Sequence, residues 1–224
     1  MSLKKEGIEF LVENRIRNDR EFYNSHKDIA NKYVIEPLKE LVIELTPYML
    51  GVDGEMIVEP KTTKTISRIA RDTRYTNDKT LYRDNMWIMF MRRRGEWIKP
   101  PGFYFDYSAN GFEYGVGFTS TDKSIIDALR ELIVSEDETF LDAYEAYNSQ
   151  DMFTMGGDRY KKDKYTGKYA DWLNMKSIYF YRREDDGDVL FGDCLAEHLI
   201  KGYEVIRPIY YLLLKAYIIA TEMK

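Results

Sequence analysis

The spacing of apolar residues changes partway along this chain, and this change limits the fold more than any other feature. Apolar residues recur at helical spacing near the start, as at Ile8, Leu11 and Ile16. From Met86 they alternate with other residues, which is typical of half-buried strands. Helical spacing returns after Asp122. This order predicts an α+β fold, with an antiparallel β-sheet meander packed by N-terminal and C-terminal helices.

The N-terminal part predicts two helices. The first ends near Asn18, and the second keeps one apolar face from Phe22 to Leu45. Asn18 and Glu21 have the spacing of a capping box at the start of the second helix. Pro37 must kink or split that helix, because proline lacks an N–H group and crowds the preceding turn.

The alternating stretch predicts strands, two of them joined by a tight turn. Asn110 and Gly111 tolerate the positive φ that a primed hairpin turn demands, so we expect them to close a hairpin. A further strand is expected late in the chain. The predicted strands are Trp87–Arg92, Gly102–Tyr107, Phe112–Phe118 and Lys176–Arg183.

Later parts of the chain predict further helices and loops. Pro208 is expected to start or kink a second helix within the C-terminal stretch. The range 185–188 reads as a turn, and the glycine-punctuated range 155–168 reads as a long surface loop. The predicted helices are Ile125–Ile133, Phe140–Tyr147 and the stretch from Asp193 onward.

Length and cysteine content predict one domain in a reducing compartment. A chain of 224 residues can bury its own core, and no linker divides it, so we expect a single α+β domain over residues 1–224. Cys194 is the only cysteine, which excludes an intramolecular disulfide framework. No charged-then-apolar leader opens the chain, so we expect a cytoplasmic protein. The oligomeric state is not indicated.

Charge and hydropathy narrow the classes of partner. The formal net charge of -5 argues against a surface devoted to nucleic acid, because affinity for a polyanion depends on cations. The most apolar run, at 209–220, is interrupted by Lys215 and is shorter than the ~20 residues of a membrane-spanning helix. We therefore expect no membrane partner.

One short segment, 67–83, concentrates arginine, lysine, aspartate and tyrosine. Guanidinium groups bind phosphate and carboxylate bidentately, and tyrosine hydroxyls add neutral hydrogen bonds. The segment therefore predicts a binding site for an anionic small molecule. The candidate ligand-binding residues are Arg68, Arg71, Asp72, Arg74, Asp78, Lys79, Tyr82 and Arg83, with Tyr75 also lining the site.

The same segment has a second interpretation, as a solvated loop with internal ion pairs. Asp72 and Asp78 are the obvious partners of its cations, and such pairs contribute little on a surface. If the segment is extended, Arg68 and Arg74 share one face while Arg71 lies on the other. Convergence of the arginines therefore requires a twist or a bulge.

A second basic region, Arg159–Tyr169, interleaves cations with tyrosines. This pattern is compatible with bases stacked along a phosphate track, which makes nucleic acid a second candidate partner. The acidic remainder of the chain weakens that hypothesis, because it opposes electrostatic steering of a polyanion.

No motif indicates a cofactor or a metal, and we expect neither. Cys194 and His198 lie four residues apart on a predicted helix, but two ligands do not make a metal site. The pair also lacks the orienting third group of a cysteine nucleophile. The glycines at 115 and 117 are not followed by a helix, and those at 156–157 lack the lysine of a P-loop.

Three stretches carry a wider pattern. They are Phe10-Leu11 with Asn14, Glu21-Phe22-Tyr23, Lys27, Tyr33 and Pro37; then Arg68-x-x-Arg71-Asp72-x-Arg74-Tyr75-x-x-Asp78-Lys79-x-x-Tyr82; then Pro101-Gly102-Phe103-Tyr104. In this pattern the chain, from about Gly7 to its end, resembles the bacterial family catalogued as domain of unknown function 2461. Phe22-Tyr23 and Leu81 depart from the residues usual in that family. The resemblance implies a single-domain soluble bacterial cytoplasmic protein and no particular reaction, and it singles out the charged motif.

Three functions are compatible with the sequence. The leading hypothesis is a protein that binds a phosphorylated or carboxylated small molecule, with Asp72 or Asp78 as the base if it is an enzyme. The second is a nucleic-acid-associated protein that uses both basic regions. The third is a protein-interaction or scaffold domain whose arginine–aspartate motif is an internal ion-pair network.

Overall fold

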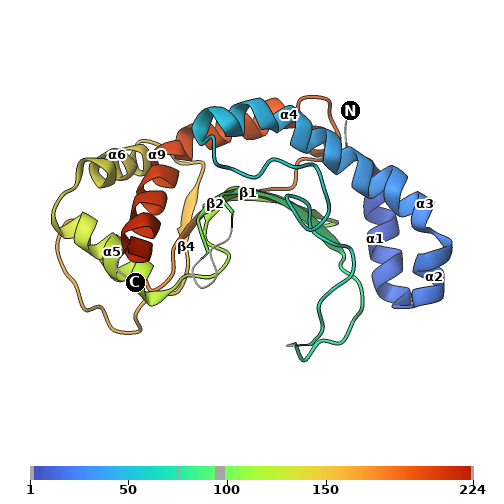
Figure 1. Cartoon of the computed structure of the whole chain (residues 1–224), viewed down its shortest axis with the longest axis horizontal. Coiled ribbons are helices and arrows are strands. Elements are labelled where there is room, and N and C mark those ends of the chain that lie inside the picture. The colour runs from blue at the N-terminus through green and yellow to red at the C-terminus, as the bar shows by residue number, and fades with distance from the viewer. Residues whose placement is uncertain (1–2, 75, 94–98, 223–224) are drawn as a thin grey trace. The chain divides into compact units, whose positions relative to one another are not determined.

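The computed structural model describes residues 3–74, 76–93 and 99–222 (Figure 1). Within them, five strands form one sheet in the order β1-β2-β3-β5-β4, and helices precede and follow the run of β1 to β3. The predicted α+β class is confirmed. The strands are β1 (Asn85–Met91), β2 (Gly102–Ser108), β3 (Gly111–Gly117), β4 (Thr154–Gly156) and β5 (Tyr179–Glu184).

Five of the described helices have eleven or more residues, and the others have four to six. The N-terminal set is α1 (Lys5–Arg17), α2 (Arg20–Ser25), α3 (Lys27–Ala30), the π-helix η1 (Asn31–Ile35) and α4 (Glu36–Val52). The later set is α5 (Lys123–Val134), α6 (Glu138–Asn148), α7 (Ala170–Leu173), α8 (Gly187–Leu190) and α9 (Leu195–Glu222). Pro208 lies inside α9, so the expected second C-terminal helix does not begin there.

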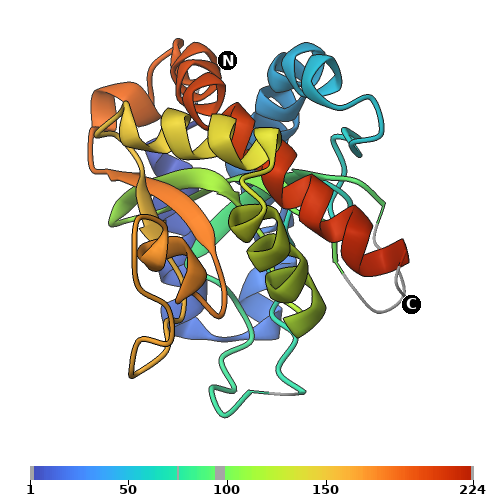
Figure 2. The ribbon, with the colours of Figure 1, turned by 90° about the vertical axis from the view of Figure 1, so that its left-hand side faces the viewer.

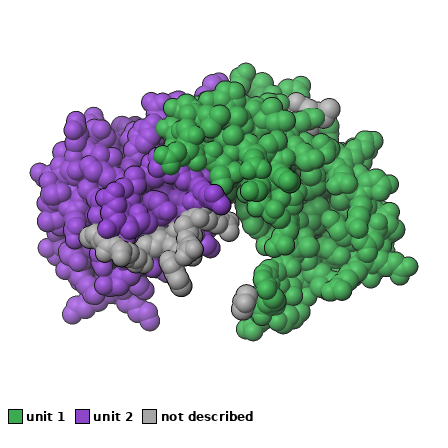
Figure 3. All heavy atoms as spheres, in the orientation of Figure 1, with its two compact units in different colours: residues 1–90, 105–113, 183–200 green, residues 91–104, 114–182, 201–224 purple. Residues whose placement is uncertain are grey.

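The chain divides into two compact units (Figure 3). Unit 1 consists of residues 1–90, 105–113 and 183–200, and unit 2 of residues 91–104, 114–182 and 201–224. Each unit is therefore assembled from three stretches that are distant in sequence. The single domain expected over residues 1–224 stays a prediction.

In unit 1, α1 forms where predicted but buries a different face. Its buried residues are Gly7, Phe10, Leu11 and Asn14, whereas Ile16 is 78% exposed. Gly7 is required by packing, because a Cβ atom at this position would lie 2.3 Å from the Tyr33 carbonyl oxygen. The glycine thus lets α1 approach the π-helix closely.

The end of α1 and the start of α2 correct the predicted capping box. Asn18 ends α1 in the left-handed conformation, with φ of 50°. Asp19 is the residue that caps α2, because its carboxylate accepts hydrogen bonds from the N–H groups of Glu21 and Phe22. This change leaves the Asn18 side chain available for a contact elsewhere.

The predicted split at Pro37 is confirmed, and a π-helix makes it. Within η1 the chain is wound wider, so that the N–H of Glu36 bonds to the carbonyl of Asn31. Pro37 then follows as the second residue of α4, and single π-turns of this kind interrupt the regular α-helical hydrogen bonding.

The hairpin between β2 and β3 forms as predicted, but with a different turn. Gly111 has φ of 99°, whereas Asn110 is not among the residues with positive φ. A type I′ turn requires positive φ at both central residues. The glycine alone therefore supplies the unusual conformation.

In unit 2, α9 packs on one end of strand β2. The Phe103 ring lies 5.1 Å from the Tyr203 ring and 5.0 Å from the Tyr210 ring, measured between centroids. The Tyr203 hydroxyl donates a hydrogen bond to the carbonyl of Tyr104 at 2.9 Å. These contacts bury tyrosine rings while satisfying a buried hydroxyl.

The connection between β4 and α7 is largely exposed, and Figure 2 shows it in orange. Asn174 is fully buried and fixes it: its side-chain oxygen accepts from the N–H groups of Lys164 and Tyr165 at 2.8 and 3.1 Å. The strand β4 and the short helices α7 and α8 were not predicted. The predicted turn at 185–188 is instead the start of α8, capped by Asp186.

Candidate anion site

The predicted anion-binding segment lies in unit 1 and folds back on itself. Ala70 and Tyr82 are paired as in an antiparallel ladder. The N–H of Arg71 bonds to the carbonyl of Leu81 at 2.8 Å, and the N–H of Arg83 bonds to the carbonyl of Ile69 at 2.9 Å. Residues 72–80 are therefore the loop that joins two extended arms, and Tyr75 within it lies outside the described residues.

A bulge separates this pairing from the edge of β1. Ile66 pairs with Ile88, while Ala70 pairs with Tyr82, so residues 67–69 on one side oppose residues 83–87 on the other. Ser67 bridges the mismatch, because its hydroxyl accepts from the N–H of Trp87 at 3.0 Å. Bulges redirect side chains. This bulge contains both Arg68 and Arg83.

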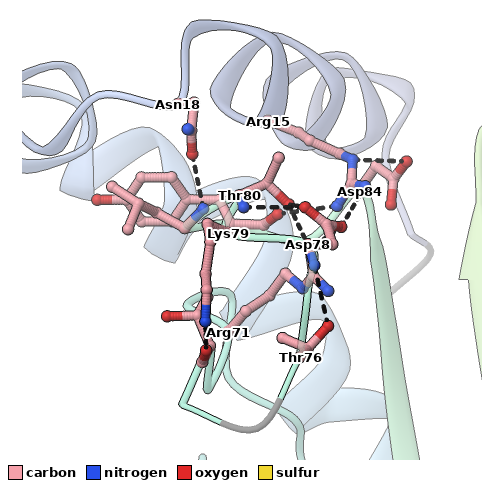
Figure 4. Close-up of polar contacts among 11 residues, drawn as sticks. Arg15, Asn18, Arg71, Thr76, Asp78, Lys79, Thr80 and Asp84 are labelled. Atoms are coloured by element: carbon pink, nitrogen blue, oxygen red, sulfur yellow. Dashed lines mark hydrogen bonds and ion pairs between the residues drawn. The ribbon is translucent and has the colours of Figure 1, made fainter.

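Arg71 is part of an internal hydrogen-bond network at the base of the loop (Figure 4). Its guanidinium donates to the Asp78 carboxylate and to the Thr80 hydroxyl. Arg15 of α1 also reaches Asp78, at 3.4 Å, and pairs with Asp84 at 3.3 Å. The network therefore ties the loop to helix α1.

Asn18 strengthens this tie through the side chain that is not used for capping. Its amide oxygen accepts from the N–H of Leu81 at 2.6 Å (Figure 4). Tyr82, the next residue, is 5% exposed, and its ring lies 4.8 Å from that of Tyr23 in α2. Burial raises the pKa of the Tyr82 hydroxyl. Tyr82 therefore anchors the segment instead of lining an open site.

Short-range contacts shape the tip of the loop. Arg74 makes two hydrogen bonds to Asp72, at 2.9 and 2.7 Å. Lys79 donates to the carbonyl of Thr73 at 2.9 Å. These side chains are exposed, so their contacts shape the loop and add little to stability.

Both aspartates of the motif are held in the charged form. Hydrogen bonds from Arg74 keep the pKa of Asp72 well below its usual range. Bonds from the Thr80 N–H and from Arg71 do the same for the pKa of Asp78. A strongly acidic carboxylate is a poor general base. The geometry therefore argues against Asp72 or Asp78 in that role.

Arg68 and Arg83 are left without an internal acceptor. Neither side chain makes a hydrogen bond or ion pair with any other described residue, and the Nε of Arg83 is buried. The Arg83 guanidinium lies over the Trp87 ring, 4.3 Å from its centroid. Burial, together with the charges of Arg71, Arg68 and Arg15, lowers the pKa of Arg83. Positive charge is thus concentrated here without full compensation.

A carboxylate that the sequence did not single out lies beside this charge. Asp106 of β2 accepts a hydrogen bond from the Asn85 amide at 2.7 Å. Burial raises the pKa of Asp106 to about 6, against an ordinary value of 3.8, and nearby Glu113 adds to the rise while Arg83 opposes it. Asp106 lies on the less buried face of β2, and the alternation of residues 102–107 is the only feature of the sequence that could have placed it there.

Comparison with protein families matches residues 6–211 to a family described as Conserved hypothetical protein (DUF2461). The chain belongs to this family. The resemblance drawn from the sequence motifs is confirmed, and the match includes every candidate residue of the segment. Searches of curated proteins and of solved structures found no match to the chain. Membership in DUF2461 assigns no reaction, so function must be argued from the site.

In the second basic region of this DUF2461 chain, several cations have internal partners. Arg159 pairs with Asp163 at 2.8 Å and with Asp171 at 2.9 Å. Lys164 lies over the Tyr160 ring, 4.0 Å from its centroid. These contacts give Arg159 and Lys164 partners within their own unit, whereas Lys161 and Lys162 are exposed.

The residues considered as metal ligands or nucleophile in this DUF2461 chain, His198 and Cys194, differ in their surroundings. His198 contacts Glu184 at 2.7 Å and the edge of the Phe112 ring, and Cys194 is exposed. Over the residues that the structure describes, no cluster of three or more His, Cys, Asp or Glu side chains could hold a metal ion. Within the same residues, no helix has the length and apolarity needed to cross a membrane.

Proposed function

We propose that this protein is a bacterial cytoplasmic protein that binds a phosphorylated or carboxylated small molecule, with Arg83 and Arg68 as the residues that hold the anionic group. The observation that carries the proposal is the buried Nε of Arg83, which has no acceptor among the described residues. Buried polar groups are normally hydrogen-bonded, so an orphaned guanidinium donor suggests an external acceptor.

The electrostatics around Arg83 favour a negatively charged acceptor. Burial and three neighbouring arginines lower the pKa of Arg83. A bound anion would oppose this shift, because an opposite charge stabilises the charged form of the guanidinium. The Arg83 guanidinium lies over the Trp87 ring, and a guanidinium placed by such a contact can use its planar fork for bidentate contact with phosphate or carboxylate.

The other residues of the motif support this site. Arg71 is bonded to Asp78 and Thr80, so it contributes charge and orders the loop. Asp72, Arg74 and Lys79 shape the loop tip. In this proposal Tyr82 positions the segment against Tyr23 and does not contact the ligand.

The test is a thermal-shift screen of phosphate, pyrophosphate, sugar phosphates and dicarboxylates, followed by calorimetry on any binder. A ligand at ~100 times its dissociation constant stabilises by ~2.7 kcal/mol, which raises the melting midpoint of a chain of this size by roughly 5–10 °C. We expect Arg83→Gln to abolish the shift. Arg17→Gln is the matched control, since Arg17 is 55% exposed and pairs with Glu13 on α1.

Two results oppose the proposal. If no anion raises the wild-type midpoint, the protein has no site of this kind. If an anion binds Arg83→Gln as tightly as the wild type, the site lies elsewhere. A shift that Arg17→Gln keeps and Arg83→Gln loses supports the proposal, provided that both variants have the circular dichroism spectrum of the wild type.

A scaffold function is the second candidate, and the Arg71–Asp78 network favours it. Asp78 accepts from Arg71, Arg15 and Thr80, so the loop has a defined shape without any ligand. A shaped loop suits protein contact as well as ligand contact. Failure of every anion in the screen, together with a lowered midpoint for Arg71→Ala, is the pattern that this function predicts.

A further inference from the structure

Asp106 and Arg83 carry opposite charges, are both partly buried, and are not paired with each other. Asp106 accepts a hydrogen bond from Asn85, which is two residues along the chain from Arg83, and the charge of each group acts on the pKa of the other. No ion pair or hydrogen bond joins them. Arg83 lies on Trp87, and Asp106 takes its bond from Asn85. Each group is therefore fixed separately by a neighbour.

The two groups have complementary hydrogen-bonding atoms without a partner, an acceptor on Asp106 and a donor on Arg83. The Asn85 amide occupies Oδ2 of Asp106, and Oδ1 has no partner among the described residues. The Nε of Arg83 likewise lacks an acceptor. Partly buried opposite charges normally pair, since each otherwise bears a desolvation cost. Two such groups held apart suit a ligand that supplies an acceptor to one and a donor to the other.

From this arrangement we infer that the ligand is an organic anion with an ammonium or hydroxyl group close to its anionic group. Arg83 holds the phosphate or carboxylate, and Asp106 accepts a hydrogen bond from the ammonium or hydroxyl. The inference rests on the proposed function and makes its ligand class narrower. Asp106 then selects among anions, since an anion without a donor leaves a carboxylate oxygen unsatisfied.

The charges around Asp106 favour a cationic donor. Glu113 of β3 and Asp84 before β1 are negative, and Arg83 is the positive group that acts on Asp106. Glu113 is itself paired with Arg183 of β5, so its charge is partly compensated. An ammonium group would relieve the repulsion among these carboxylates more than a hydroxyl would.

Matched ligands test the inference: ethanolamine phosphate against ethyl phosphate, and β-alanine against propionate. Each pair differs by the ammonium group alone. Calorimetry on the whole chain at pH 7.5 should show the ammonium member binding at least about tenfold more tightly, as expected for one charge-assisted hydrogen bond. Asp106→Asn should reduce the preference to about twofold or less while ethyl phosphate still binds. Arg83→Gln should bind neither member of either pair.

Asp28→Asn is the matched control, because Asp28 is an exposed carboxylate on α3 of the same unit. It should keep the full preference. Asp106→Asn should stay folded, because the new amide oxygen can still accept from Asn85, and its circular dichroism spectrum checks this.

The possible results of these experiments distinguish the inference from the proposed function. Equal binding of the two members by the wild type overturns the inference, as does a preference that survives in Asp106→Asn. Binding of inorganic phosphate with rejection of all four probes also overturns it, while the proposed function stands. Failure of phosphate and of every probe overturns both.

Discussion

The two basic, tyrosine-containing regions of this chain differ in where their charges go. In the loop 159–169 of unit 2, Arg159 is bonded to two aspartates, and the nearby Arg130 contacts the rings of Tyr160 and Tyr165. In the segment 68–83 of unit 1, Arg71 and Arg74 are also paired, but Arg68 and Arg83 are not. The regions look alike in sequence and differ in this one respect.

A high density of cations in a segment does not by itself make an anion site. An arginine that already bonds internal carboxylates and carbonyls has few donors left for a ligand. Only an arginine that the fold leaves without an acceptor gains from binding an anion. Substitutions in the loop should therefore change stability, whereas substitutions at Arg83 should change binding.

The largest expected effect is on stability, from Arg130→Ala. Arg130 is 12% exposed and donates to the carbonyls of Leu173 and Met175 at 3.1 and 2.8 Å. Its removal leaves buried acceptors unsatisfied and should cost about 3 kcal/mol. Thermal unfolding should show a midpoint lower by roughly 6–12 °C. Lys123→Ala is the control, since Lys123 shares the partner Asp127 but is 90% exposed.

A midpoint for Arg130→Ala that equals that of Lys123→Ala would mean that the loop is not fixed by Arg130. It would also contradict the statement that the arginines around the loop 159–169 contribute to stability. The expected outcome is a large loss for the first variant and a shift within experimental error for the second.

Asp106, which lies beside the first region, and Asp163 of the second should respond to pH with opposite signs. Asp106 has a pKa of about 6 when folded and an ordinary value of 3.8, so the folded state binds its proton more tightly. Its contribution to the free energy of unfolding therefore falls as pH rises from about 4 to 6. Asp106→Asn should stabilise the protein at pH 7 by ~2 kcal/mol, with no gain near pH 3.5.

Asp163 provides the comparison in unit 2. Hydrogen bonds from Arg159 lower its pKa, so its stabilising contribution is present above pH about 4 and is lost as pH falls. Asp163→Asn should not stabilise the protein at pH 7. Urea unfolding at a series of pH values measures both variants, and a stabilisation by Asp106→Asn that is independent of pH would refute the assignment.

Arg71→Ala should produce a smaller loss. Arg71 is 17% exposed and bonds across the loop base to Asp78 and Thr80, so its removal should lower the melting midpoint by a few degrees, on the order of 2–4 °C. It should also weaken anion binding, because it removes charge beside Arg83. Full retention of the midpoint would show that the internal network does not order the segment.

The smallest expected effect is a gain, from Arg83→Met. Methionine keeps a contact with the Trp87 ring and removes a partly buried charge that has no partner. Thermal unfolding without added anion should show stabilisation of about 0.5–1 kcal/mol. Destabilisation by this variant would indicate that Arg83 has a structural partner and would place it with the arginines of the loop.

Hydrophobic spacing was sufficient to predict the main elements of the fold. The alternation from Phe112 to Phe118 and the spacing from Ile125 to Ile133 correspond to β3 and α5, because each pattern matches a single period. β4 was missed because three residues are too few to show a period. The role of Asn18 was missed because its partner, Leu81, is 63 residues away.

The site was predictable as a segment but not as a geometry. Charge density identified the residues 68–83, whereas the pairing of Arg71 and the isolation of Arg83 depend on a bulge and on contacts with α1. Asp106 lies in a strand that looks like ordinary alternation, and only its position beside Asn85 and Arg83 distinguishes it. Such features arise from tertiary pairing and leave no local mark in the sequence.

The most direct test of the central claim is an NMR titration that observes the Nε–Hε signals of the arginines while inorganic phosphate is added. We predict that the signals of Arg83 and Arg68 move and saturate together, while those of Arg159 and Arg130 stay in place. Variants of each arginine assign the signals. If the signal of Arg83 does not move, or if all arginines drift alike without saturation, the claim that unpartnered arginines form the anion site is contradicted.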